Sequence, residues 1–227
     1  MASFTKHASI AAMVLFAGAA GAQEKVTLGG AGSMIPVSQE LAKAFQAKNV
    51  LRPLGRAPVV FAAGKDVTVT GLKDTQVCDL FSGKATSWKD VGGSELKVTV
   101  LTRNEDDGTK EAVRKNVACF KDLKESPDAS VLIRSTAMIS GLRSQPGAIG
   151  MTELDVVEDA KGAFKALALD GVAASAETVR SGKYRLVKEY GYATQGEPQG
   201  LAKRFLDFVT SPDAGKILAA NGIVAAR

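Results

Sequence analysis

Two glycine-containing turns hold the residues of this sequence that are best suited to binding an anion. The first turn, residues 29–33, lies between a β-rich segment and an amphipathic stretch. A helix that begins there would present free backbone N–H groups and the positive end of its dipole. Ser33 would add a hydroxyl donor, although it could equally act only as the helix cap.

The second turn, residues 103–109, also lies where a strand pattern gives way to a helix pattern. Arg103 could bind an oxyanion through two parallel hydrogen bonds. The N–H groups of Gly108 and Thr109, with the Thr109 hydroxyl, could supply neutral donors. The alternative, which the spacing alone favours, is a surface loop in which Asp106 or Asp107 caps the helix and pairs with Arg103.

Other chemistries have little support. The only histidine is His7, within a predicted targeting signal, so the mature chain would have none. Its absence excludes Ser–His and Cys–His catalytic pairs and histidine metal sites. A Ser-x-x-Lys match at residues 94–97 leads into a strand and has no accompanying KTG motif. We therefore expect a binding protein with no cofactor or metal, rather than an enzyme.

Residues 1–22 have the features of a signal peptide. Lys6 precedes an apolar run, and Ala20-Gly21-Ala22 fits the small-x-small cleavage rule, so the mature chain would start at Gln23. The run is too short to be a permanent membrane span. With no cysteine at the cleavage point, a lipid anchor is not expected. These features predict a soluble protein exported to the periplasm.

The charge balance is mildly basic. The chain has 29 basic and 24 acidic residues, a formal net charge of +5, which falls to +4 without Lys6. This excess is compatible with an anionic ligand. No basic block is interleaved with aromatic residues, so nucleic-acid binding is not expected.

The mature chain has two cysteines, Cys78 and Cys119. An exported protein meets an oxidising compartment, and an even number of cysteines then indicates a disulfide. The alternative is a pair of buried free thiols.

Strand and helix patterns alternate along the chain, which predicts an α/β architecture. Trp88 and Tyr184 are interpreted as packing residues rather than stacking platforms. Ordered segments at 59–62 and 189–193 are candidates for crossings between two lobes. The strand patterns are at residues 25–28, 57–62, 97–101, 148–151, 165–169 and 184–187, and the helix patterns are at 33–46, 74–81, 109–120, 139–142, 201–209 and 214–220.

Several segments, in order, resemble the substrate-binding proteins of phosphate ABC transporters. Residues 30–33 (GAGS) resemble that family's first anion loop, and residues 78–93 (CDLFSGKATSWKDVGG) resemble its "IFxGKITNWKDVGG" stretch in one ungapped run. Residues 98–109 resemble its strand and "RxxxSGT" loop. Residues 146–150 (PGAIG) resemble "PGAIGY", and residues 205–218 resemble "FLxFxxSPEGQKIL".

The resemblance implies a type II periplasmic-binding-protein fold, with two α/β lobes closing on a ligand cleft. Lobe I would hold residues 23–62 and 191–227, and lobe II residues 63–190. The ligand would be inorganic phosphate or a similar oxyanion, delivered by a monomeric receptor to an ABC transporter permease in the inner membrane. The ligand contacts implied by matching positions are Gly32, Ser33, Met34, Arg103, Asp107, Gly108 and Thr109.

Two departures from the family pattern bear on this function. The serine of "SGT" is replaced by Asp107, whose carboxylate repels a fully ionised oxyanion and can accept a hydrogen bond only from a protonated one. The family also has a longer segment between the first helix and the strand at 57–62. The alternative function is therefore a periplasmic scaffold or sensor with weak or no ligand binding.

Overall fold

The computed structural model describes residues 12–13, 27–28 and 49–226. The first glycine turn, Met34 and most of the predicted signal peptide lie outside the described residues. The chain forms two compact units, one comprising residues 1–54, 190–216 and 226, and the other comprising residues 55–189, 217–225 and 227. The lobe boundaries given above stay a prediction.

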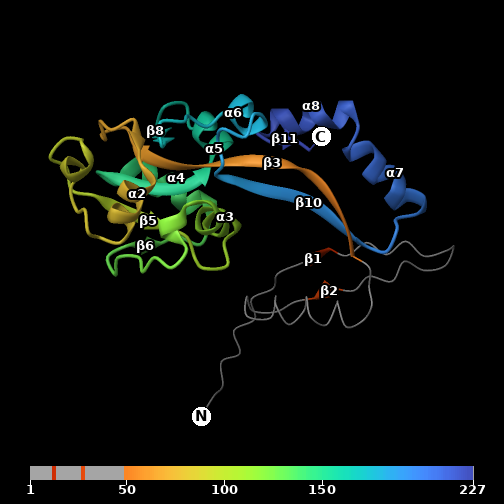
Figure 1. The fold of residues 1–227 in the computed structure, drawn as a ribbon, viewed down its shortest axis with the longest axis horizontal. Coiled ribbons are helices and arrows are strands. Elements are labelled where there is room, and N and C mark those ends of the chain that lie inside the picture. Colours follow the sequence, from red (N-terminus) through yellow and green to blue (C-terminus); the bar gives the residue numbers. More distant parts are fainter. Residues whose placement is uncertain (1–11, 14–26, 29–48, 227) are drawn as a thin grey trace, which may run out of the picture. The chain divides into compact units, whose positions relative to one another are not determined.

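Most of the larger unit is built on a mixed β-sheet (Figure 1), whose strands β3 and β10 continue into residues assigned to the smaller unit. The sheet follows the order β10-β3-β7-β5-β6, and β8 and β11 also pair with β3. Strand β7 is antiparallel to β3 and parallel to β5, which is in turn parallel to β6. The bounds are β3 Asn49–Gly64, β5 Thr99–Thr102, β6 Ser130–Val131, β7 Ala148–Glu153, β8 Phe164–Ala166, β10 Val187–Gln195 and β11 Val224–Ala225.

Helices α3 and α4 both contact β7, and each begins near the end of a sheet strand (Figure 1). The helices of the larger unit are α2 Asp74–Phe81, α3 Gly108–Asn116, α4 Ser135–Ser144, α5 Leu154–Asp159 and α6 Ala176–Arg180, with 3-10 turns η1 Trp88–Val91 and η2 Ala118–Phe120. Outside the main sheet, β4 Gly71–Leu72 pairs with β9 Ala168–Leu169, and β1 Ala12–Met13 pairs with β2 Thr27–Leu28.

The central strands are buried on both faces, which explains their continuous apolar sequence. Residues 57–63 of β3 and residues 148–152 of β7 are all buried. Phe61 of β3 packs against Phe81 and Phe120, with ring centroids 5.6 and 6.3 Å away. Trp88 is fully buried, as predicted for a packing residue, and its indole N–H donates to the carbonyl oxygen of Gly147 at 2.9 Å.

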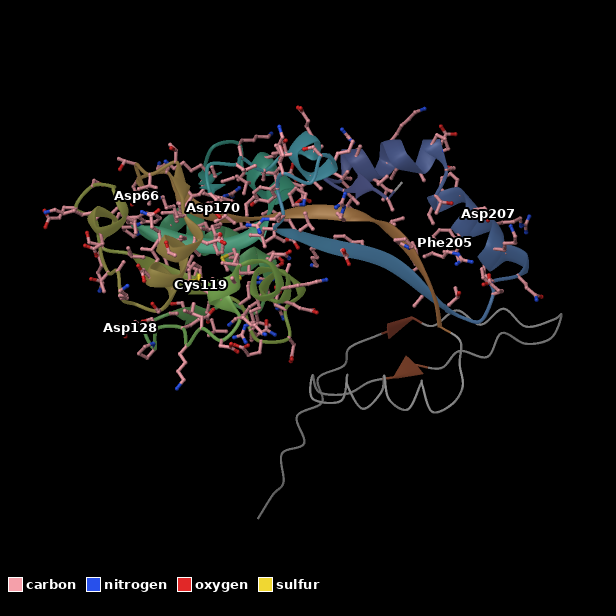
Figure 2. All side chains as sticks on the ribbon, in the orientation of Figure 1. Asp66, Cys119, Asp128, Asp170, Phe205 and Asp207 are labelled. Carbon is pink, nitrogen blue, oxygen red and sulfur yellow. A yellow bond between two sulfur atoms is a disulfide. The ribbon has the colours of Figure 1, made fainter. Side chains whose placement is uncertain are left out.

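The predicted disulfide is confirmed. Cys78 on α2 is bonded to Cys119 in η2 (Figure 2), so the bond joins two elements that pack against the same aromatic cluster. The alternative of two free thiols is wrong.

The sequence also predicted three elements incorrectly. The helix predicted at 109–120 ends at Asn116, because Val117 adopts an extended backbone, and η2 follows. The strand predicted at 165–169 is two short strands separated by Leu167. The strand predicted at 184–187 begins only at Val187, since the amide of Tyr184 bonds to the end of α6 at Thr178 O. Tyr184 is nevertheless a packing residue, because it is buried and its hydroxyl donates to the Val59 carbonyl oxygen at 2.7 Å.

The described part of the smaller unit includes α7, Gly200–Val209, and the first turns of α8, Pro212–Ala220. Within it the ring of Phe205 (labelled in Figure 2) lies edge-on to Tyr192 at 5.4 Å. Arg52 pairs with Glu197 at 2.9 Å. None of the helices in the described ranges has both the length and the apolar character needed to span a membrane.

Candidate functional site: an arginine beside two helix starts

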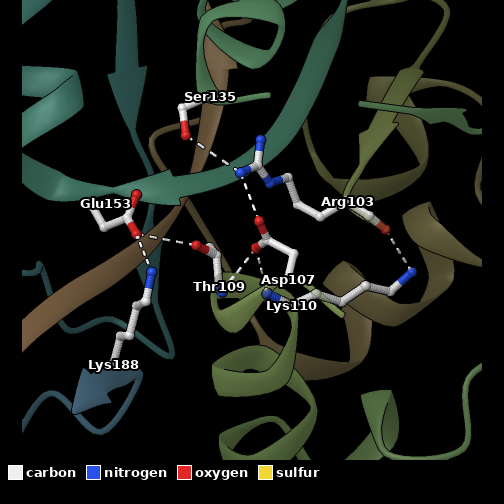
Figure 3. Close-up of polar contacts among 7 residues, drawn as sticks. All are labelled: Arg103, Asp107, Thr109, Lys110, Ser135, Glu153 and Lys188. Carbon is white, nitrogen blue, oxygen red and sulfur yellow. Dashed lines mark hydrogen bonds and ion pairs between the residues drawn. The ribbon is translucent and has the colours of Figure 1, made fainter. Parts of the chain in front are cut away.

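The second glycine turn is closed by Asp107, the N-cap residue of α3. Its Oδ1 accepts hydrogen bonds from the amides of Thr109, at 2.8 Å, and Lys110, at 3.3 Å (Figure 3). These are the amides that a bound anion would need at this helix start. The carboxylate therefore already occupies the anion-binding end of α3.

Arg103, the residue after β5, pairs with the other oxygen of the same carboxylate. Its Nη2 lies 2.7 Å from Asp107 Oδ2 and 3.4 Å from Ser135 Oγ. The Arg103 side chain is only 7% exposed, and its Nε and Nη1 have no hydrogen-bond partner among the described residues. Buried donors without an acceptor are costly and rare, so these two nitrogens indicate that an acceptor belongs beside them.

The pairing keeps Asp107 ionised. Burial alone would raise the pKa of this carboxyl. The hydrogen bond and charge of Arg103, with the amides of Thr109 and Lys110, outweigh burial and hold the pKa below its ordinary value of 3.8. At neutral pH the turn therefore contains an arginine and an aspartate whose formal charges cancel.

The Thr109 side chain bonds to a different carboxylate from the one that its amide contacts. Its hydroxyl donates to Glu153 Oε1 at 3.1 Å, and the Lys188 ammonium lies 3.0 Å from the same oxygen (Figure 3). Gly108 permits this arrangement, because a Cβ at Gly108 would lie 3.0 Å from Cε of Lys188. The Thr109 hydroxyl hydrogen, predicted to serve a ligand, is thus used within the protein.

Lys110, whose side chain is buried, holds the turn in place through three hydrogen bonds. Its side chain is 2% exposed, and its ammonium donates to the Arg103 carbonyl oxygen at 3.0 Å and to Glu105 and Glu125 at 2.8 Å each. The hydrogen bond from Lys110 is the main reason that the pKa of Glu105 is lowered. Because these bonds fix the backbone at Arg103, the guanidinium is held in place at the end of β5.

The structure brings together Arg103, Asp107, Gly108 and Thr109, while Gly32, Ser33 and Met34 lie outside the described residues. Of the two alternatives for the second turn, the carboxylate cap paired with arginine is the one observed, although Arg103 is buried and Asp107 partly buried rather than on an exposed loop. Sequence reasoning missed four polar side chains around the turn, namely Lys110, Ser135, Glu153 and Lys188. A serine opening a helix pattern could have indicated Ser135, but no local signal indicated Lys188. No cluster suited to a metal ion occurs within the described ranges.

Comparison with known proteins identifies related sequences. Residues 17–213 match the family model of the PBP superfamily domain. The phosphate-binding protein PstS of Bacillus subtilis is 31% identical over 155 residues, which are 68% of this chain and 50% of that protein. PstS of Staphylococcus epidermidis is 24% identical over 204 residues, 84% of this chain and 61% of that protein. The chain thus spans only about half the length of the Bacillus relative.

Solved structures share the fold. A protein from Clostridium perfringens, crystallised with bound phosphate, has a TM-score of 0.72 and 24% identity, covering 82% of this chain and 75% of that one. An ABC-type phosphate transport receptor from Vibrio cholerae has a TM-score of 0.65 and 20% identity, covering 78% and 72%. The predicted α/β, type II periplasmic-binding-protein fold and the predicted family resemblance are confirmed. The chain belongs to the PBP superfamily.

Proposed function

We propose that this protein is a solute-binding protein that captures inorganic phosphate or a similar oxyanion. The observation that carries the proposal is the Arg103 guanidinium, which is buried, positively charged and left with two donors that have no acceptor among the described residues. An oxyanion supplies acceptors of the right geometry and charge for such a group.

The relatives support the same ligand. Two of them are named phosphate-binding proteins, and a structural relative was crystallised with phosphate. By this proposal the predicted first turn, with Gly32, Ser33 and Met34, would contribute the ligand contacts of lobe I. Gly108 and Thr109 would border the ligand on lobe II.

The proposal extends to the setting of the protein. The predicted signal peptide, residues 1–22, would direct a soluble, monomeric receptor to the periplasm, where it would deliver its ligand to an ABC transporter permease. The matching family is one of binding proteins, and the sequence after residue 22 contains no histidine. A binding role without catalysis is therefore the simplest reading of the site.

Calorimetric titration of the purified protein with phosphate tests the proposal. Arg103→Ala should weaken binding at least tenfold, which corresponds to about 1.4 kcal/mol. Arg103→Lys should recover only part of the loss, because an ammonium cannot offer the forked donors of arginine. Arg143→Ala is the matched control, since it removes the same charge from an exposed position of α4. Equal binding by Arg103→Ala and the wild type would refute the assignment.

A second function is favoured by one observation, the Asp107 carboxylate bound to the α3 amides and to Arg103. A protein that satisfies its own anion-binding groups could act as a periplasmic scaffold or sensor with weak or no ligand binding. The absence of any thermal shift with phosphate, sulfate, arsenate or tungstate would favour this alternative.

A further inference from the structure

We propose that Ser135 and the first turn of α4 hold the oxyanion against Arg103, so that the ligand lies beside α4 and not on the amides of α3. This inference rests on the proposed function and specifies its binding position. It assigns a ligand contact to Ser135, a residue that neither the sequence pattern nor the predicted contacts had indicated.

The start of α3 is a poor position for a second anion. Asp107 Oδ1 already accepts from the amides of Thr109 and Lys110, and Asp107 Oδ2 from Arg103. An incoming oxyanion could use those amides only by displacing the carboxylate. Displacement would separate a buried ion pair whose side chains are only 7% and 14% exposed, so the internal carboxylate is expected to stay in place.

The start of α4, unlike that of α3, has no side-chain carboxylate from the described residues on its first amides. Its N-cap residue is Arg134, whose side chain makes no capping hydrogen bond. Further along the helix, the amides of Ala137 and Met138 both bond to the Arg134 carbonyl oxygen. Residues 135 and 136 are exposed, and α4 has ten residues, long enough to present amide donors and a positive dipole end.

Arg103 provides the independent indication that a ligand belongs here. Figure 3 shows its guanidinium between the Asp107 carboxylate and the Ser135 hydroxyl, with Nη2 shared between the two. The contact to Ser135 Oγ is long, at 3.4 Å. The hydroxyl can therefore rotate to donate to an oxyanion that accepts from the buried Nε or Nη1 of Arg103. A small tetrahedral oxyanion would then be bound by a guanidinium, a hydroxyl and a helix start.

Substitution of Ser135 separates this position from one on α3. Ser135→Ala should weaken phosphate binding about tenfold in a calorimetric titration. Because Ser135 is exposed and its hydroxyl makes a single, long hydrogen bond to the part of the chain that the structure describes, the substitution should leave the melting temperature of the ligand-free protein unchanged. Ser140→Ala is the matched control, since it removes another exposed hydroxyl from the same helix.

Backbone amide NMR spectra of the full chain give a second readout. Phosphate should shift the amide signals of Ser135 and Thr136 at lower concentrations than those of Thr109 and Lys110. Phosphate binding that shifts only Thr109 and Lys110, with Ser135→Ala as tight as the wild type, would overturn this inference and leave the proposed function standing. An absence of phosphate binding by the wild type would refute both.

Discussion

Replacing Asp107 with serine should make the protein bind phosphate more tightly while making the ligand-free protein less stable. Serine is also a good N-cap residue, so α3 should keep its start. The substitution removes the negative charge that is paired with Arg103. The side chains of Asp107 and Arg103 are only 14% and 7% exposed, respectively. The guanidinium would then be free to balance a ligand.

The gain in affinity can be estimated from the charge that is removed. A carboxylate about 5 Å from a bound monoanion repels it by about 3 kcal/mol at an effective dielectric constant of about 20, and by half as much if the site is twice as polarisable. Phosphate should therefore bind about 10- to 100-fold more tightly to Asp107→Ser. Breaking the buried pair should lower the free energy of unfolding without ligand by about 3 kcal/mol.

Calorimetry and thermal melting together test these opposite effects. Asp107→Ser should melt below the wild type without ligand and show the larger rise in melting temperature when phosphate is added. Asp106→Ser is the matched control, because it removes the same charge from an exposed neighbour in the same turn. If Asp107→Ser binds phosphate no more tightly than the wild type, Asp107 does not compete with the ligand and the reasoning fails.

Three further predictions concern stability. The pKa of Asp107 is lower in the folded protein than its ordinary value of 3.8, so the ionised carboxylate stabilises the fold at pH values above 3.8. This stabilisation is lost as the pH falls through the lowered pKa. Asp107→Asn should therefore flatten the decline in unfolding free energy below about pH 4, measured by urea titrations. Reducing the Cys78–Cys119 bond, which spans 41 residues, should lower the free energy of unfolding by about 4 kcal/mol, and equal urea midpoints with and without reductant would contradict this. Gly147→Ala should destabilise more than Gly171→Ala in the same assay: both glycines have positive φ (64° and 78°), costing about 1–2 kcal/mol for alanine, but only at Gly147 would a Cβ collide with a neighbouring carbonyl oxygen.

The parts of the fold that the sequence predicted well are those set by local pattern. The apolar run at 57–62 lies within β3, and the helix at 74–81 has the predicted bounds. The disulfide followed from cysteine number and compartment. Tyr184 was misassigned because its amide bonds to Thr178 rather than to a neighbouring strand, a tertiary contact that no local β-propensity reveals.

The site was predictable only in part, for the same reason. Arg103 and Asp107 are four residues apart, so their pairing could be foreseen as an alternative. The Thr109 hydroxyl donates to Glu153, which ends β7, and Glu153 in turn accepts from Lys188 in β10, so both residues come from far along the chain. Only the sheet, which places β3 between β7 and β10, brings these two side chains to the start of α3.

A capping aspartate and a bound oxyanion compete for the same backbone amides at a helix start, because both offer oxygen acceptors and negative charge. At α3 the Asp107 carboxylate already accepts three hydrogen bonds, two from backbone amides and one from Arg103. A free anion must displace the Asp107 carboxylate, which the chain holds in place, or bind at another position where hydrogen-bond donors have no acceptor. At this turn, the buried donors that remain without an acceptor among the described residues are Nε and Nη1 of Arg103. Ser135, which Arg103 contacts, lies in the first turn of α4, where the N-cap side chain makes no capping hydrogen bond. If the proposed position beside α4 is right, an aspartate in place of serine in this turn moves the bound oxyanion from the start of α3 to the start of α4 and does not abolish binding.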